Sequence, residues 1–207
     1  MSDRFKSMTE LMKLTEENTD WIINSIERNS NVIITAIHGG AIEPATTELA
    51  ELTAEKGGFD YFTFKAIRTK ANAELHVTSR HYDEPKLMKM IANNTYAIAI
   101  HGCKGKDEII YMGGKDEQLM DAMTEEFEKL GIDVRQAPPH MSGAHDDNII
   151  NCCKTEKGVQ LELTSGIRKK LFENERYNKK SRENSSNWAQ LMYDFAQAII
   201  NATKNIA

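Results

Sequence analysis

The sequence predicts a single α/β domain over residues 1–207, an α/β/α sandwich whose central sheet is mixed and mainly parallel. Apolar runs rich in β-branched residues, such as Val32–Ile37 and Thr95–Ile100, are typical of strands buried on both faces. Segments with helical spacing of apolar residues alternate with these strands, which favours an α/β architecture. A length of 207 residues fits one domain, and no repeat or low-complexity linker divides the chain.

The first half of the chain opens with a short helix, a strand and a polar turn. Pro44 suits the first turn of the next helix, because the N–H that proline lacks would have no partner there. In chain order, we predict a helix at Phe5–Glu17, strands at Trp21–Ile26 and Val32–Ile37, a helix at Glu43–Lys56, and strands at Asp60–Ile67 and Leu75–Thr78.

In the second half of the chain, helices and strands again alternate. Pro85 again falls in the first turn of a helix, and Asn184, Ser185 or Ser186 is expected to cap the last one. The predicted elements are a helix at Glu84–Asn93, strands at Thr95–Ile100 and Glu108–Met112, a helix at Lys115–Leu130, strands at Ile132–Gln136 and Val159–Thr164, and a helix at Asn187–Thr203.

Composition and charge exclude several classes of function. The net charge is −5 with no basic run longer than a pair, which argues against a nucleic-acid partner. No apolar stretch is long enough for a membrane span. Three cysteines are a poor disulfide framework, and no secretory signal is recognisable. We therefore expect a cytoplasmic protein, with release by cell lysis left open, and take a monomer as the default.

Two histidines follow predicted buried strands directly, and glycine follows each of them. On adjacent parallel strands, His38 and His101 would lie side by side at one edge of the sheet, where ligand sites gather in such folds. Glu43 lies five residues after His38, so its carboxylate can fold back towards that imidazole. Two imidazoles and a carboxylate with one open position are typical of catalytic zinc. We therefore predict a Zn²⁺ site held by His38, Glu43 and His101, although strand-capping histidines remain the simpler interpretation of each alone.

Four segments then resemble one known family, the poly-γ-glutamate hydrolases. They are H-G-G-A-I-E-P at His38–Pro44, H-V-T-S-R-H-Y-D-E-P at His76–Pro85, I-H-G-C at Ile100–Cys103 and G-V-Q-L-E-L-T-S-G-I-R at Gly158–Arg168. The resemblance implies a fold and metal site similar to those of zinc carboxypeptidases and aspartoacylase-like amidohydrolases. It also implies hydrolysis of γ-glutamyl amide bonds, with poly-γ-glutamate as the known substrate class.

Glu162 is the candidate general base, because amide hydrolysis needs a group that accepts a proton from water and passes it to the leaving nitrogen. It interrupts the apolar strand Val159–Thr164, although alternation on that strand is also compatible with a solvent-facing carboxylate. An anionic γ-glutamyl polymer would need cationic partners, for which Arg80 and Arg168 are the candidates. Either arginine could also be an ordinary solvated side chain.

Other histidines are given ordinary roles. We interpret His76 and His81 as structural, with an orienting or oxyanion-donor role as the alternative. His140 and His145 lie in a polar loop with Asp146 and Asp147, which we interpret as loop polarity rather than a lid or a rival metal site.

Three further functions stay open at this point. The first is a zinc deacylase of a small N-acyl amino acid, which would differ from the polymer hydrolase only in its pocket. The second is a cysteine amidase using Cys103 beside His101. The third is a non-enzymatic zinc-binding module, which three ligands without cysteine disfavour.

Overall fold

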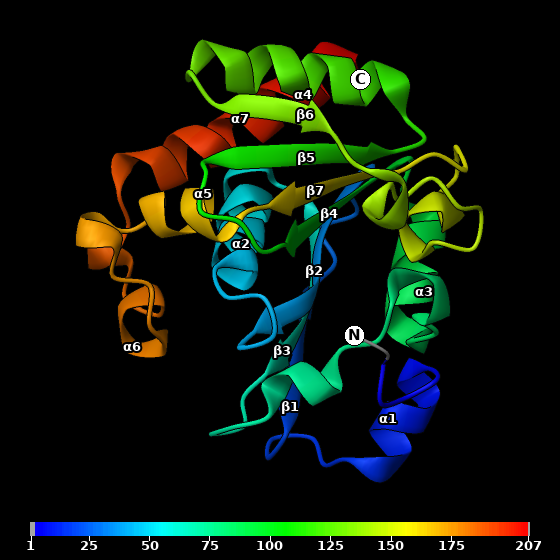
Figure 1. The fold of residues 1–207 in the computed structure, drawn as a ribbon. Coiled ribbons are helices and arrows are strands. Elements are labelled where there is room, and N and C mark those ends of the chain that lie inside the picture. Colours follow the sequence, from blue (N-terminus) through cyan, green and yellow to red (C-terminus); the bar gives the residue numbers. More distant parts are fainter. Residues whose placement is uncertain (1–2, 207) are drawn as a thin grey trace.

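The computed structural model describes residues 3–206 and contains one seven-stranded sheet. Its strands are β1 (Trp21–Ile26), β2 (Val32–Gly40), β3 (Asp60–Ala66), β4 (Tyr96–Gly102), β5 (Ile109–Gly114), β6 (Asp133–Gln136) and β7 (Val159–Leu163). They are ordered β1-β3-β2-β4-β7-β5-β6 across the sheet (Figure 1). Only β1 with β3 and β5 with β7 pair antiparallel. The predicted mixed, mainly parallel sheet is confirmed.

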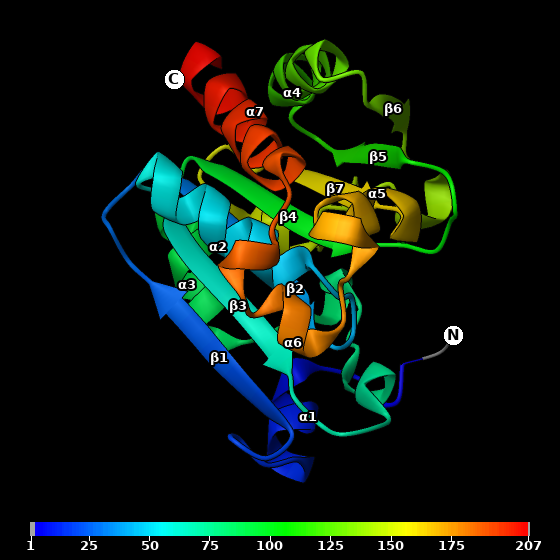
Figure 2. The same ribbon diagram turned by 90° about the vertical axis from the view of Figure 1, so that its left-hand side faces the viewer.

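Helices cover both faces of the sheet (Figures 1 and 2). On one face, α2 (Thr46–Gly57), α4 (Glu117–Lys129) and α7 (Gln190–Ile206) pack into a large apolar cluster. On the other face, α1 (Met8–Leu14) and α3 (Pro85–Asn93) form a second cluster. Two short helices, α5 (Ser165–Lys170) and α6 (Lys179–Arg182), were not predicted. With both faces covered, all nine residues of β2 are buried, as the apolar run at its start predicts.

One predicted strand is wrong. Leu75–Thr78 is an irregular segment between two 3₁₀ turns, Asn72–Leu75 and Ser79–His81. Leu75 and Val77 are buried against α1 and α3, so their alternation with polar residues reflects a loop that covers the core. This loop, residues 67–84, forms one wall beside the ends of β2 and β4.

Several helices begin later than predicted, among them those expected from Glu43 and Asn187. The helix expected from Glu43 begins at Thr46, so Pro44 lies in the preceding loop. The helix expected from Asn187 begins at Gln190, and Asn184 caps a separate 3₁₀ turn instead. In the second case Trp188 is held in a β-bridge with Phe172, which delays the helix.

The topology places β2, β4 and β7 next to one another at the centre of the sheet, all parallel. Their carboxyl ends therefore meet at one edge, which is where ligand sites form in such sheets. None of the helices in residues 3–206 combines the length and the hydropathy needed to cross a membrane.

Candidate metal centre

Three donor groups converge at this edge of the sheet. His38 Nδ1 lies 3.1 Å from Glu43 Oε1 and 3.1 Å from His101 Nδ1. His101 Nδ1 lies 3.4 Å from Glu43 Oε2. Ligand atoms bonded to one tetrahedral zinc at about 2.1 Å are separated by roughly 3.4 Å. The three predicted ligands are therefore brought together at the spacing of a metal site.

A β-bulge turns His38 towards this cluster. Between the pairs Ala36–Thr63 and Gly39–Lys65, β2 contributes two residues and β3 only one, so Ile37 and His38 together oppose Phe64. Strict alternation would place His38 on the face opposite Ile37. The extra residue keeps both side chains on the face that carries Ile37, where His101 also points. Sequence periodicity alone would have directed His38 to the wrong face.

Glu43 reaches the histidines from a tight loop. Its N–H donates to the His38 carbonyl at 2.9 Å, and its Oε2 accepts the Gly102 N–H at 2.9 Å. Although burial raises the pKa of Glu43, the charges and hydrogen bonds of His38 and His101 more than offset this and hold it below its usual range. Glu43 is therefore an ionised carboxylate, the form in which a carboxylate binds a metal.

The imidazoles are also suited to a cation. His38 Nε2 lies 2.8 Å from the Val77 carbonyl, a pure acceptor, so the neutral form of the ring, which is the form that binds a metal, carries its proton on Nε2 and presents a lone pair at Nδ1. That lone pair faces His101 Nδ1, while His101 Nε2 is buried and has no partner among the described residues. If Nε2 of His101 keeps its proton, two lone pairs and a carboxylate face one point. The donor set fits a divalent cation such as zinc.

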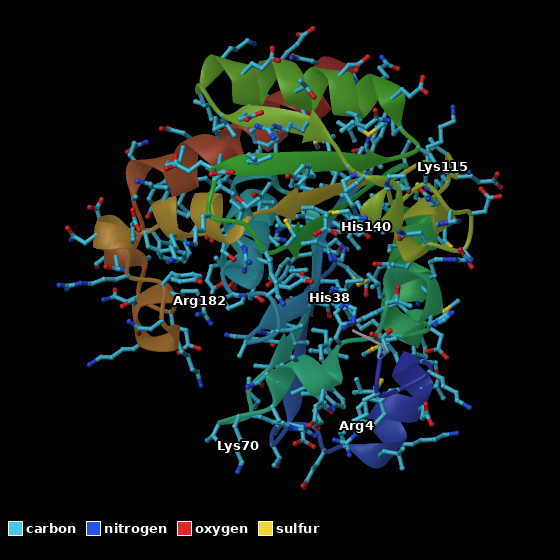
Figure 3. The ribbon with its side chains drawn as sticks, in the orientation of Figure 1. Arg4, His38, Lys70, Lys115, His140 and Arg182 are labelled. Atoms are coloured by element: carbon cyan, nitrogen blue, oxygen red, sulfur yellow. The ribbon has the colours of Figure 1, made fainter. Side chains whose placement is uncertain are left out.

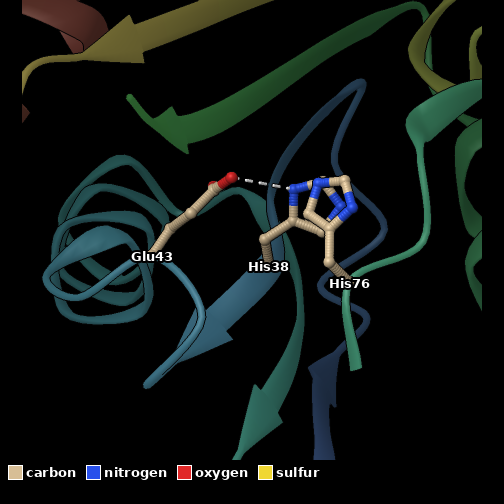
Figure 4. Close-up of side chains that lie close together, drawn as sticks. All are labelled: His38, Glu43 and His76. Carbon is tan, nitrogen blue, oxygen red and sulfur yellow. Dashed lines mark hydrogen bonds and ion pairs between the residues drawn. The ribbon is translucent and has the colours of Figure 1, made fainter. Parts of the chain in front are cut away.

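His76 lies against the same cluster. Its ring centroid is 4.0 Å from that of His38 with 32° between the planes, whereas the His38 and His101 centroids are 4.9 Å apart at 59°. Two imidazoles bound to one tetrahedral zinc would place their centroids about 5 Å apart. His101 meets that spacing, whereas His76 stacks on His38 (Figure 4). A place for His76 beside the site corresponds to the alternative role considered for it, not to the structural role that we favoured.

Glu162 faces the cluster from β7. It is paired in register with His101 on β4, and neighbours in register share a face of the sheet. Gln160 Nε2 donates to Glu162 Oε1 at 3.2 Å. Burial raises the pKa of Glu162 to about 7. The predicted alternation on this strand is real, but the polar side faces a cleft rather than open solvent.

The cleft at the cluster has a volume of about 470 Å³. His38, Glu43, His101 and Glu162 line it, together with residues of the loops 76–80 and 139–148. His140 and His145 belong to the second of these loops, and His140 is labelled near His38 in Figure 3. The loop that we interpreted as merely polar therefore borders the candidate site.

The two predicted substrate-binding arginines lie in different surroundings. Arg80 lines the cleft, where its guanidinium makes two hydrogen bonds to Asp147 at 2.7 and 2.8 Å. Arg168 is 5% exposed and donates to the carbonyls of Leu163, Pro44 and Cys103. It thus ties together the loops that follow His38 and His101. Contact of either arginine with substrate stays a prediction.

Cys103 is unsuited to be a nucleophile. Burial, reinforced by the charge of Glu162, raises the pKa of its thiol to about 11. The reactive form of a cysteine is the thiolate, which this environment disfavours. The structure therefore gives the cysteine-amidase alternative no support.

Gly102, directly after His101, makes room for Arg168. A Cβ at this position would lie 2.7 Å from Arg168 Cζ. We predict that Gly102→Ala lowers the free energy of unfolding by about 1–3 kcal/mol, measured by urea denaturation, because the guanidinium must move away from its carbonyl partners. In an Arg168→Met background the same change should cost less; an equal cost in both backgrounds would contradict this explanation.

Comparisons with known proteins point to one family. A sequence model described as Poly-gamma-glutamate hydrolase matches residues 5–198. The UPF0714 protein YndL of Bacillus subtilis (strain 168) is 33% identical over 207 residues, which are 98% of this chain and 79% of YndL. The structure of a bacteriophage poly-gamma-glutamate hydrolase shares 30% identity with a TM-score of 0.93, covering 99% of this chain and 98% of that one. A zinc-free apo structure of YndL shares 31% identity with a TM-score of 0.90, again covering 99% and 98%.

Proposed function

Because the chain belongs to the poly-gamma-glutamate hydrolase family and is therefore an enzyme, we propose that it hydrolyses γ-glutamyl amide bonds with a zinc ion held by His38, Glu43 and His101. The observation that carries the proposal is the convergence of His38 Nδ1, His101 Nδ1 and the Glu43 carboxylate within 3.1–3.4 Å of one another. The relative YndL has been described in a zinc-free form, which supports zinc as the metal.

Zinc at this site would act as a Lewis acid that polarises the scissile carbonyl and lowers the pKa of a coordinated water to about 7. The protein's own part is to hold that cation without filling its fourth position. Three protein ligands and one open position are typical of catalytic rather than structural zinc. This arrangement disfavours a non-enzymatic zinc-binding module.

Glu162 moves the proton in the proposed reaction. Its carboxylate accepts a proton from the attacking water as the oxygen bonds to the carbonyl carbon. The resulting carboxylic acid then gives this proton to the amide nitrogen as the carbon–nitrogen bond breaks, so Glu162 ends ionised. A pKa near neutrality suits a group that must both accept and donate. Gln160 holds one carboxylate oxygen, and the water would bind to the other.

The substrate class follows from the family and from the charge around the cleft. A γ-glutamyl polymer carries one α-carboxylate per residue, and Arg80 lies on the wall of the cleft. Arg168 and Lys104 border a second hollow on the other side of Glu43. We propose that Arg80 and Arg168 supply positive charge for these carboxylates, which the net charge of −5 of the whole chain would not attract.

The test is to incubate the purified protein with poly-γ-glutamate, with and without a chelator, and to follow polymer length on a gel. We expect shortening that the chelator abolishes and added zinc restores. If the polymer stays intact while the protein binds one zinc per chain, the proposal that poly-γ-glutamate is the substrate is wrong. Deacylation of small N-acyl amino acids would then be assayed next. Cleavage that survives full removal of zinc would contradict the metal-dependent mechanism.

A further inference from the structure

We propose that His76, held by Asp3 of the N-terminal segment, is a further catalytic residue that accepts a hydrogen bond from the attacking water. The inference rests on the proposed function, because it assigns a partner to the same water that Glu162 deprotonates. It joins two residues that are 73 positions apart in the sequence, and the juxtaposition is visible only in the fold.

Asp3 fixes the orientation of the His76 ring. One carboxylate oxygen of Asp3 lies 2.6 Å from His76 Nδ1, and the other accepts the Thr78 N–H at 2.7 Å. Both oxygens are thus bound to the same loop. The N-terminal segment is itself anchored by Phe5, which is 4% exposed, and by Thr9, which makes two hydrogen bonds to Asp83. Asp3 is therefore a positioning residue on a fixed segment.

The other nitrogen of His76 faces the metal cluster. A ring nitrogen of His76 and one donor atom each of His38 and Glu43 lie within 4.8 Å of one another. Because Nδ1 is engaged by Asp3, Nε2 is the nitrogen available on the cluster side (Figure 4). Stacking of His76 on His38 at 4.0 Å places its ring beside that ligand rather than at the angle of a second ligand to the same zinc.

The chemistry of the water explains what this nitrogen can do. A water has two hydrogens, and Glu162 takes only one of them. The Asp3 carboxylate can only accept, so it favours the tautomer with the proton on Nδ1 and a lone pair on Nε2. That lone pair can hold the second hydrogen and so fix the orientation of the water oxygen towards the carbonyl carbon. No proton needs to leave through His76.

The kinetic test uses His76→Ala, His76→Gln and Asp3→Asn in the zinc-loaded, full-length protein. We expect His76→Ala to lower kcat about 10- to 100-fold with little change in KM and one zinc per chain retained. His76→Gln keeps an acceptor oxygen and should recover part of the loss. His81→Ala, which removes a histidine of the same loop that does not line the cleft, is the matched control and should keep kcat within about twofold.

The Asp3→Asn variant distinguishes two roles of Asp3: setting which nitrogen of His76 carries the proton, and merely anchoring the loop. Asparagine keeps an acceptor for the Thr78 N–H, but its amide can donate to His76 Nδ1 and so move the ring proton to Nε2. We expect kcat to fall about as far as in His76→Ala, and no further loss when the two changes are combined. A purely structural role of Asp3 would leave kcat intact in Asp3→Asn, which would overturn its assignment.

A second readout needs no substrate. ¹⁵N NMR of the histidine rings in the zinc-loaded protein should show His76 protonated on Nδ1 and bare on Nε2, and the reverse in Asp3→Asn. If His76→Ala loses zinc, His76 is a ligand and the proposal is wrong. A ring protonated on Nε2 in the wild type would also overturn it, whether or not the polymer is cleaved. Failure of the proposed function alone would appear as an inactive wild type with the expected tautomer.

Discussion

Replacing His101 with alanine is expected to abolish zinc binding and polymer hydrolysis together. The change removes one of three donors that face a single point and leaves only His38 and Glu43. Two protein ligands hold zinc poorly, and the stabilisation that the metal gives the transition state amounts to several kcal/mol. We predict fewer than about 0.1 zinc per chain by mass spectrometry of metals, and a fall in kcat/KM of at least about 10³-fold. His38→Ala should behave in the same way.

His81→Ala is the matched control for this prediction. His81 belongs to the same loop as His76 but lines a separate hollow, away from the metal cluster. It should keep both zinc and activity. Zinc binding at wild-type affinity in both His38→Ala and His101→Ala would show that the ligand set is wrong.

Glu162→Gln is expected to keep the metal and lose the reaction. Glutamine preserves the size of the side chain and can still contact Gln160, but it cannot accept a proton from water at neutral pH. Removal of a general base commonly costs 10²- to 10⁴-fold in rate, and here the same group also serves as the acid. We predict one zinc per chain, a nearly unchanged KM, and kcat lowered by about 10³-fold.

The control for this effect is Glu128→Gln. Glu128 lies on α4, is exposed to solvent and does not line the cleft. That variant should retain wild-type kcat. Near-normal turnover of Glu162→Gln would show that another group accepts the proton. Loss of zinc in Glu162→Gln would instead make Glu162 part of the metal site.

Much of the fold could be predicted because local sequence pattern and final environment agree. The runs Trp21–Ile26 and Val32–Ile37 are strands in the structure, and the second extends to Gly40. His38 and His101 could be paired from sequence because each follows a buried strand at the same edge of a parallel sheet. The five-residue spacing to Glu43 was also sufficient to predict that its carboxylate returns to His38.

The remaining features depend on contacts that local pattern does not encode. The bulge at Ile37 and His38 exists only relative to β3. Leu75–Thr78 alternates like a strand, yet it covers the core without a partner strand. His76 is held in position by Asp3, which lies 73 residues earlier in the sequence. Each is set by tertiary packing, which overrides local propensity.

The most direct measurement is a crystal structure of the zinc-loaded protein with anomalous diffraction recorded at the zinc absorption edge. The account predicts one strong peak about 2.0–2.2 Å from His38 Nδ1, His101 Nδ1 and a Glu43 oxygen, with His76 outside bonding distance. A peak bonded to His76 in place of His101, or no peak at this edge of the sheet at full zinc loading, would contradict it.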